Sequence, residues 1–154
     1  MIGIIGAMDE EVAQIVEVMQ VEREESKACM TFKAGKLNGK DVVVVRSGIG
    51  KVNAAVCTQI LVDDFNVDYV INTGIAGSLK AEINIADIVI SSDVLHHDMD
   101  ATGFGYPLGQ IPRMEVLSFE ADKKLIELAD KACKKVLPEI GTHIGRIVSG
   151  DQFI

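Results

Sequence analysis

Short runs of apolar, mostly β-branched residues alternate along the chain with longer segments in which apolar residues recur every three or four positions. The short runs are bounded by glycine or charged residues, which predicts β-strands. Several are apolar at consecutive positions, as in strands that are covered on both faces. The predicted strands span residues 1–6, 28–34, 42–45, 69–72, 85–90 and 142–148.

The longer segments predict helices over residues 9–20, 52–64 and 118–137. The first opens with acidic residues, which suit a helix N-terminus. The last has a possible N-cap at Ser118 and stops before Pro138. Strands that alternate with helices predict an α/β fold with a largely parallel or mixed sheet. Because no repeat, low-complexity segment or linker interrupts residues 1–154, we expect a single domain.

Composition narrows the class of partner and the compartment. The 15 basic and 23 acidic residues give a formal net charge of −8, which disfavours nucleic acid or an anionic membrane as the main partner. Three cysteines, Cys29, Cys57 and Cys133, are widely spaced and favour neither a disulfide scaffold nor a zinc ribbon. The first apolar run is too short for a signal peptide or a membrane span. We therefore expect a cytoplasmic protein.

Glycine-containing turns follow three of the predicted strands, at residues 5–8, 46–51 and 72–77. Such turns meet at the carboxyl edge of an open α/β sheet, where glycine lets a ligand approach the backbone. A dinucleotide site is disfavoured, because the first turn lacks the required glycine spacing and acids follow it. A P-loop is disfavoured as well, since Val45 and Val52 stand where glycine and a hydroxyl residue belong.

Acidic residues at positions 9–11 permit two interpretations: compensation of the helix dipole, or a carboxylate poised as a general base for water. The spacing alone does not separate the two. His96 and His97 suggest a metal site, but adjacent side chains in an extended segment point to opposite sides, and no second cluster completes a ligand set. A polar loop is the preferred interpretation there. The long segment 91–118 lacks a sustained period and is expected to be functional or interfacial.

Six segments together resemble the 5′-methylthioadenosine/S-adenosylhomocysteine nucleosidase family, and the match runs in order from end to end. They are residues 4–12, 47–55, 71–77, 87–91, 104–106 and 149–154. The resemblance implies the nucleoside phosphorylase superfold, an α/β sandwich with a central mixed sheet flanked by helices. It also implies a homodimer that hydrolyses the bond between adenine and a 5′-thioribose in methionine salvage, with neither metal nor organic cofactor.

The resemblance also assigns roles to individual residues. Glu11 matches the acid that activates the attacking water. Phe153 matches a residue that stacks on adenine, and the Ile154 backbone one that reads its edge. Phe104 and Pro112 match residues that reach the partner subunit's 5′-substituent pocket. The remaining substrate-binding positions are Ala7, Met8, Ile49, Ile75, Ala76 and Gly77. A smaller or hydroxylated residue often occupies the position of Ile75, which puts a side-chain hydrogen bond there in doubt.

Hydrolysis of a nucleoside passes through an oxocarbenium-like sugar, so the enzyme must protonate the base, stabilise the ribose and deliver water. In the family, the acids that hold the ribose and protonate the base lie beyond the equivalent of Ile154. We therefore expect the domain to be incomplete at its C-terminus and the 154-residue chain alone to be inactive. The alternatives are a phosphorylase, a hydrolase of a related nucleoside such as futalosine, and a non-catalytic nucleoside-binding fragment.

Overall fold

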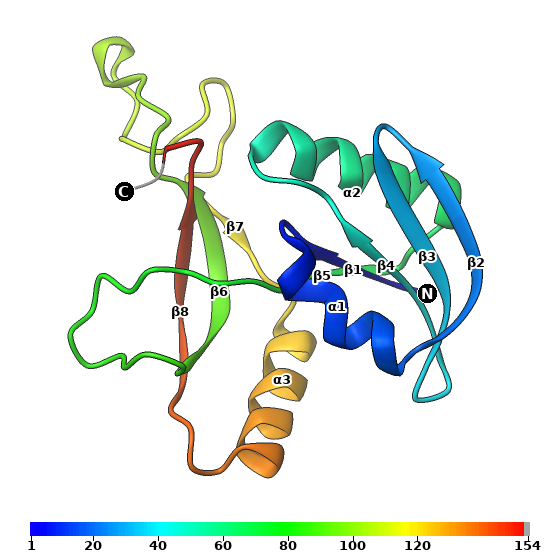
Figure 1. Ribbon diagram of the computed structural model, residues 1–154. Helices are drawn as coiled ribbons and strands as arrows, with labels where there is room; N and C mark the ends of the chain where they lie inside the picture. Colours follow the sequence, from blue (N-terminus) through cyan, green and yellow to red (C-terminus); the bar gives the residue numbers. More distant parts are fainter. Residues whose placement is uncertain (153–154) are drawn as a thin grey trace. The chain divides into compact units, whose positions relative to one another are not determined.

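The first five strands form one mixed sheet in the computed structural model, which describes residues 1–152 as two units, residues 1–76 and residues 77–152 (Figure 1). The strand order is β2-β3-β4-β1-β5. Strand β1 pairs in parallel with β4 and β5, whereas β2, β3 and β4 pair antiparallel. The bounds are β1 Ile2–Gly6, β2 Gln20–Lys27, β3 Met30–Leu37, β4 Lys40–Arg46 and β5 Tyr69–Asn72.

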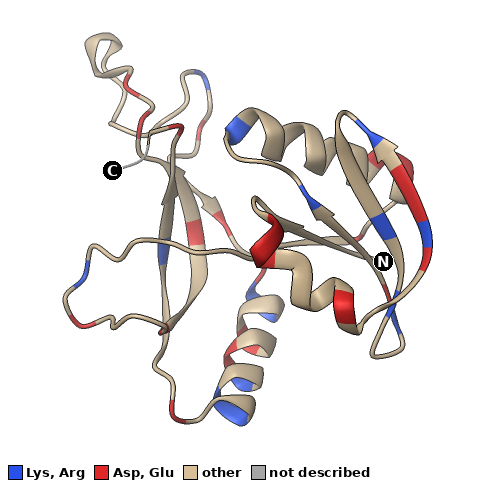
Figure 2. Cartoon of the chain, viewed as in Figure 1, with Lys and Arg blue, Asp and Glu red and all other residues tan. Residues whose placement is uncertain are grey.

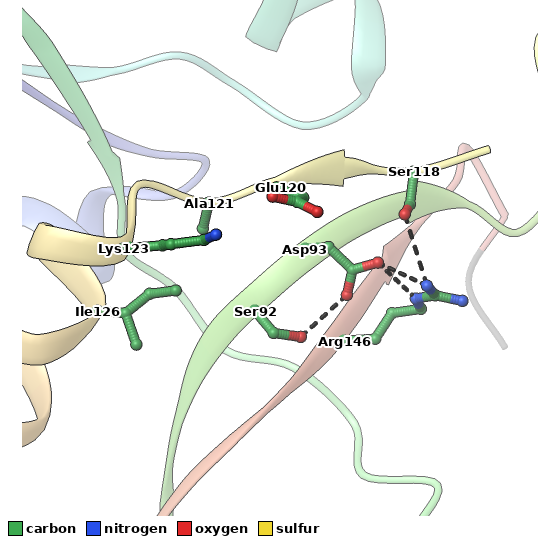
Figure 3. A pocket seen from close by; sticks show the side chains of 8 residues that line it. All are labelled: Ser92, Asp93, Ser118, Glu120, Ala121, Lys123, Ile126 and Arg146. Carbon is green, nitrogen blue, oxygen red and sulfur yellow. Dashed lines mark hydrogen bonds and ion pairs between the residues drawn. The ribbon is translucent and has the colours of Figure 1, made fainter. Parts of the chain in front are cut away.

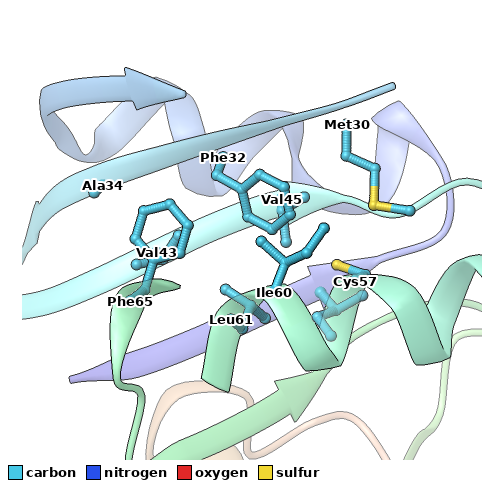
Figure 4. Packing of buried hydrophobic residues seen from close by; sticks show 10 residues of the cluster. Met30, Phe32, Ala34, Val43, Val45, Cys57, Ile60, Leu61 and Phe65 are labelled. Atoms are coloured by element: carbon cyan, nitrogen blue, oxygen red, sulfur yellow. The ribbon is translucent and has the colours of Figure 1, made fainter. Parts of the chain in front are cut away.

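Helices α1 (Asp9–Val18) and α2 (Lys51–Phe65) cover opposite faces of this sheet. Successive side chains of a strand point to opposite faces. Val43 and Val45 accordingly pack with α2, and Val42 and Val44 pack in the cluster that includes α1. Figure 4 shows the α2 side, where the rings of Phe32 and Phe65 stack. Burial on both faces explains the uninterrupted valine run of β4.

The sequence analysis does not predict strand β2, which the structure shows over Gln20–Lys27. All of its residues are exposed, and it pairs with β3 along one edge of the sheet. Figure 2 shows the mixed charges that it carries. Charged side chains on an edge strand discourage pairing with another chain, and they also remove the hydrophobic alternation that would have revealed the strand.

The second unit contains a three-stranded sheet of order β7-β6-β8 and one α-helix. Strands β6 (Ile88–His96) and β8 (Thr142–Ser149) are parallel, and β7 (Phe119–Glu120) pairs antiparallel with β6. The helix is α3 (Lys123–Val136), and a short 3₁₀ helix, η1, spans Thr102–Phe104.

The predicted N-cap at Ser118 is wrong. Helix α3 begins at Lys123, and the side chain of its N-cap Asp122 accepts a hydrogen bond from the Leu125 N–H at 2.9 Å. Pairing with β6 takes Phe119 and Glu120 into β7 instead. The strand expected over residues 85–90 begins later and runs six residues further.

The α/β class with mixed sheets is confirmed, whereas the single domain over residues 1–154 stays a prediction. None of the helices described for residues 1–152 is long and apolar enough to cross a membrane.

Candidate functional site

Glu11 lies in the first turn of α1, two residues after the helix begins at Asp9. The backbone N–H groups of Ala7 and Met8 donate to its Oε2 at 2.7 and 3.0 Å. The N–H of Ile75, 64 positions along the chain, donates to Oε1 at 3.0 Å. A capping box accounts for the Met8 bond, because an acid at this position of a helix reaches back to the N-cap N–H. Capping does not account for the bond from Ile75.

The topology of the sheet explains how residues 7 and 75 meet. The Ser47 N–H donates to the Gly6 carbonyl at 2.9 Å, and the Thr73 N–H donates to the Ile5 carbonyl at the same distance. Each bond continues the parallel ladder with β1 by one residue beyond the end of β4 or of β5. The three glycine-containing turns therefore leave the sheet side by side at its carboxyl edge, as the sequence pattern predicts.

Two glycines make room for the Glu11 carboxylate. A Cβ atom on Gly74 would lie 2.5 Å from Oε1 and 3.0 Å from the carboxylate carbon. A Cβ atom on Gly6 would lie 2.7 Å from Val12 Cγ1 and 3.0 Å from the Glu11 Cβ. Only glycine at these positions permits the observed approach of the carboxylate to the ends of β1 and β5.

Polar contacts hold the second turn, which follows β4. The buried Ser47 hydroxyl donates to the Gly48 carbonyl at 2.9 Å, and the Asn53 side chain donates to the Ile49 carbonyl at 2.7 Å. Positive φ angles at Gly48 and Gly50 complete the turn. The side chain of Ile49 is thereby left 75% exposed. Ser47 and Asn53 were not identified as site residues from the sequence, although both lie in the motif at residues 47–55.

Ile75 takes part through its backbone. Its side chain is 83% exposed, and its N–H makes the bond to Glu11. The contact with Glu11 therefore does not need a hydrogen-bonding side chain at position 75. Ala76, which follows, and Gly77, which begins the second unit, are both exposed.

Other predicted residues lie in the second unit. Phe104 ends η1 with its side chain 87% exposed, and Pro112 is exposed in the same long segment. Internal bonds support this segment: Asp100 accepts from the N–H and hydroxyl of Thr102, and the Gly109 N–H donates to the Met99 carbonyl at 2.8 Å. Phe153 and Ile154 lie outside the described residues.

The second unit contains a pocket of about 390 Å³ whose lining residues are mostly polar or charged (Figure 3). Its buried Asp93 faces Arg146, whose Nη2 and Nε lie 2.6 and 2.8 Å from one carboxylate oxygen. Hydrogen bonds from Arg146, Ser118 and Ser92 lower the Asp93 pKa to about 2. Such a carboxylate stays ionised and paired near neutral pH, so it suits a structural role better than proton transfer.

Within residues 1–152, no group of three or more His, Cys, Asp or Glu side chains could hold a metal ion. The segment that begins at His96 thus forms no such cluster.

Comparison with known proteins gives consistent results. The model of the phosphorylase superfamily matches residues 1–154. A 5′-methylthioadenosine/S-adenosylhomocysteine nucleosidase of Staphylococcus haemolyticus is 49% identical over the whole chain, which covers 66% of that protein. The nucleosidase of a Marinomonas species is 48% identical over 99% of the chain, which covers 65% of it.

Solved structures agree with the sequence relatives. The nucleosidase of Colwellia psychrerythraea in complex with adenine is 45% identical, with a TM-score of 0.94 over 99% of this chain and 63% of that one. The Neisseria meningitidis nucleosidase in complex with methylthio-immucillin-A is 40% identical, with the same TM-score and 65% of its length covered. The chain thus spans about two thirds of the length of the relatives it matches. It belongs to the phosphorylase superfamily, and its resemblance to the nucleosidases of that superfamily is confirmed.

Proposed function

We propose that the protein hydrolyses the N-glycosidic bond of 5′-methylthioadenosine and S-adenosylhomocysteine, releasing adenine and the 5′-thioribose. The observation that carries the proposal is the Glu11 carboxylate, held by three backbone N–H groups where three parallel strands end. Relatives 45–49% identical to this chain are nucleosidases, and one of them binds adenine.

The hydrogen bonds of Glu11 leave one oxygen better suited to take a proton. An ionised carboxylate offers about four acceptor positions, two on each oxygen. Oε2 accepts two N–H bonds and Oε1 accepts one. Oε1 therefore keeps an acceptor position for a water molecule, while the other bonds fix its direction. Glu11 would act as general base for this water, and its negative charge would favour the positive charge that develops on the ribose.

We assign the remaining site residues by resemblance. Ala7 and Met8 would line the site beside Glu11, with Met8 near the ribose, and Ile49 would lie near the 5′-thio group. The backbone of Ala76 and Gly77 would contact the base, which Phe153 and Ile154 would hold. Ile75 is a further substrate-binding position. The support from the structure is that Ala7, Met8 and Ile75 gather around Glu11, and that Ile49 lies in the turn beside them.

Oligomeric state and compartment form part of the same proposal. A phenyl ring 87% exposed on a segment held by its own hydrogen bonds suits insertion into a second subunit, so we propose a homodimer in which Phe104 and Pro112 reach the partner's site.

We also propose that the protein is cytoplasmic. The cysteines of the described residues are free, and Cys29 is exposed, which suits the reducing cytoplasm.

Adenine release measured with and without phosphate tests hydrolysis against phosphorolysis. Phosphate capture favours arginine at the glycine turns. Arg46 stands at one of them, but its Nε lies 3.1 Å from Asp9 Oδ1. We expect the native protein to release adenine from 5′-methylthioadenosine equally fast without phosphate. Strict dependence on phosphate would show a phosphorylase, and turnover of futalosine alone would show the related hydrolase.

We further propose that residues 1–154 alone do not turn over substrate, because the described site supplies a base for water and the resemblance assigns no base-protonating acid within them. The test is adenine release by a preparation whose intact mass matches 154 residues. Full activity in that preparation would contradict this part of the proposal.

A further inference from the structure

The parallel strands β6 and β8 are joined at each end by the side chain of an aspartate that lies just outside β6. These aspartates are Asp87 at one end and Asp98 at the other. At the C-terminal end, the last paired residues are His96 and Ser149. The His97 N–H then donates to the Ser149 carbonyl at 3.0 Å, which extends the ladder by one bond. Two residues further along, the Asp98 side chain replaces the backbone as acceptor, because its Oδ2 accepts the Asp151 N–H at 2.9 Å. Two consecutive residues thus hold the chain as it leaves β8.

Gly150 lies between these two bonds, and its lack of a side chain brings the strands together. A Cβ atom there would lie 2.4 Å from His97 Nε2 and 2.9 Å from the Asp98 carboxylate carbon. The imidazole ring and the carboxylate therefore pack directly on the Gly150 backbone. The direction in which the chain leaves β8 depends on this packing and on the bond to Asp151.

The N-terminal end of β8 is built in the same way and supplies an internal comparison. Asp87 Oδ1 accepts the Gly141 N–H at 3.1 Å, and the Ile88 N–H donates to the Gly141 carbonyl at 2.8 Å. A Cβ atom on Gly141 would lie 2.6 Å from the Asp87 carboxylate. At each end of β8, a glycine thus packs against the carboxylate of an aspartate. Only the C-terminal end leads directly into the proposed adenine-binding pair, because Phe153 comes two positions after Asp151.

We propose that Asp98 is a positioning residue for base binding, because it fixes the chain at Gly150 and Asp151, two positions before Phe153 in the sequence. This inference rests on the proposed function, because those two residues are its adenine-binding pair. Asp98 acts through the Asp151 N–H and the packing on Gly150, without touching substrate. Asp87 bonds the Gly141 N–H in the same way at the opposite end of the strand, and it also accepts the Asn84 N–H at 2.9 Å and lies 3.0 Å from His143 Nε2. Because that end does not lead into the adenine-binding pair, we expect loss of Asp87 to affect stability rather than base binding.

The experiment compares Asp98→Ala with Asp87→Ala in the native protein, measuring KM and kcat for 5′-methylthioadenosine, the Kd of adenine by calorimetry, and the thermal midpoint. Loss of a hydrogen bond to a charged group changes an equilibrium constant that depends on it by about tenfold or more. We expect Asp98→Ala to raise KM and the Kd of adenine about tenfold with kcat reduced far less, because base binding is shared by ground and transition states. Asp87→Ala lowers the thermal midpoint and leaves both constants within about twofold. Asp98→Asn, which keeps an acceptor oxygen, restores most of the affinity.

A second pair of variants covers the case in which Asp98→Ala does not fold. Gly150→Ala, which pushes His97 and Asp98 away, raises KM, whereas Gly141→Ala does not. Equal KM changes in the two aspartate variants, or in the two glycine variants where they replace them, would overturn the positioning role. A native protein that releases no adenine from either substrate would instead overturn the proposed function.

Discussion

Replacement of Gly74 by alanine tests whether the position of the Glu11 carboxylate matters to the reaction. The added Cβ would lie 2.5 Å from Oε1, and ordinary contact begins at 3.4 Å. The carboxylate must therefore withdraw by about 0.9 Å. Its bond to the Ile75 N–H, now 3.0 Å long, would be stretched or lost. Gly74→Ala thus moves the proposed base while leaving its chemistry intact.

The expected cost follows from this displacement. A misplacement of about 1 Å in a reacting group can cost on the order of 100-fold in rate. That factor corresponds to about 2.7 kcal/mol of transition-state stabilisation. We expect kcat for adenine release to fall by about this factor. KM changes less, because the base acts on water rather than on the bound nucleoside.

The assay is steady-state adenine release by the native protein, by Gly74→Ala and by Gly145→Ala as the control. A Cβ on Gly145, in β8, meets nothing within 4 Å, so that variant should match the native rate. Thermal unfolding of both variants separates a displaced base from a destabilised fold. A Gly74→Ala protein that keeps kcat within about threefold of native would refute the reasoning, since a carboxylate forced to move would then be dispensable.

Two further predictions concern stability. Leu61 is fully buried among the side chains of α2 and the first sheet, so Leu61→Ala should lower the free energy of unfolding by about 2–5 kcal/mol in urea titrations. Val62 is about half exposed, so Val62→Ala should lower it by well under half as much. Equal losses in the two variants would contradict the assigned core. The Asp93 pKa lies near 2 in the folded protein because Arg146 bonds it, against an ordinary value of 3.8. The stability that this pair contributes is therefore complete above about pH 4 and lost as the pH falls towards 2. In acid titrations Asp93→Asn should be less stable than native at pH 7 and approach it at pH 2, and a constant difference would contradict the pairing.

The elements predicted correctly are those whose signal is local. The valine run of β4 is buried on both faces, so its hydrophobicity alone reveals it. Strand β2 offers no such signal, because pairing with β3 makes it a strand although every residue is exposed. The start of α3 differs from the prediction for a related reason: pairing with β6 takes Phe119 out of the helix. Tertiary pairing overrides local preference in both cases.

The site shows the same division. The sequence pattern placed three glycine-containing turns at one edge of a sheet and left Glu11 as one of three acids at a helix start. Only the resemblance distinguished it from Asp9 and Glu10. The physical distinction is the Ile75 N–H, which lies 64 positions away and reaches Glu11 only because β5 lies beside β1. Asp9 instead pairs with Arg46 on the surface. No local pattern encodes a contact of that range.

The central claim, that Glu11 activates the attacking water, is tested most directly by the rate of adenine release from Glu11→Gln. Glutamine keeps the size of the side chain, but it cannot accept the proton of water and it turns a donor towards the backbone N–H groups. We expect the rate to fall by about 1,000-fold or more, while calorimetry shows that the nucleoside still binds. A Glu11→Gln protein that releases adenine within a few-fold of the native rate would contradict the claim and leave Glu11 as a helix cap.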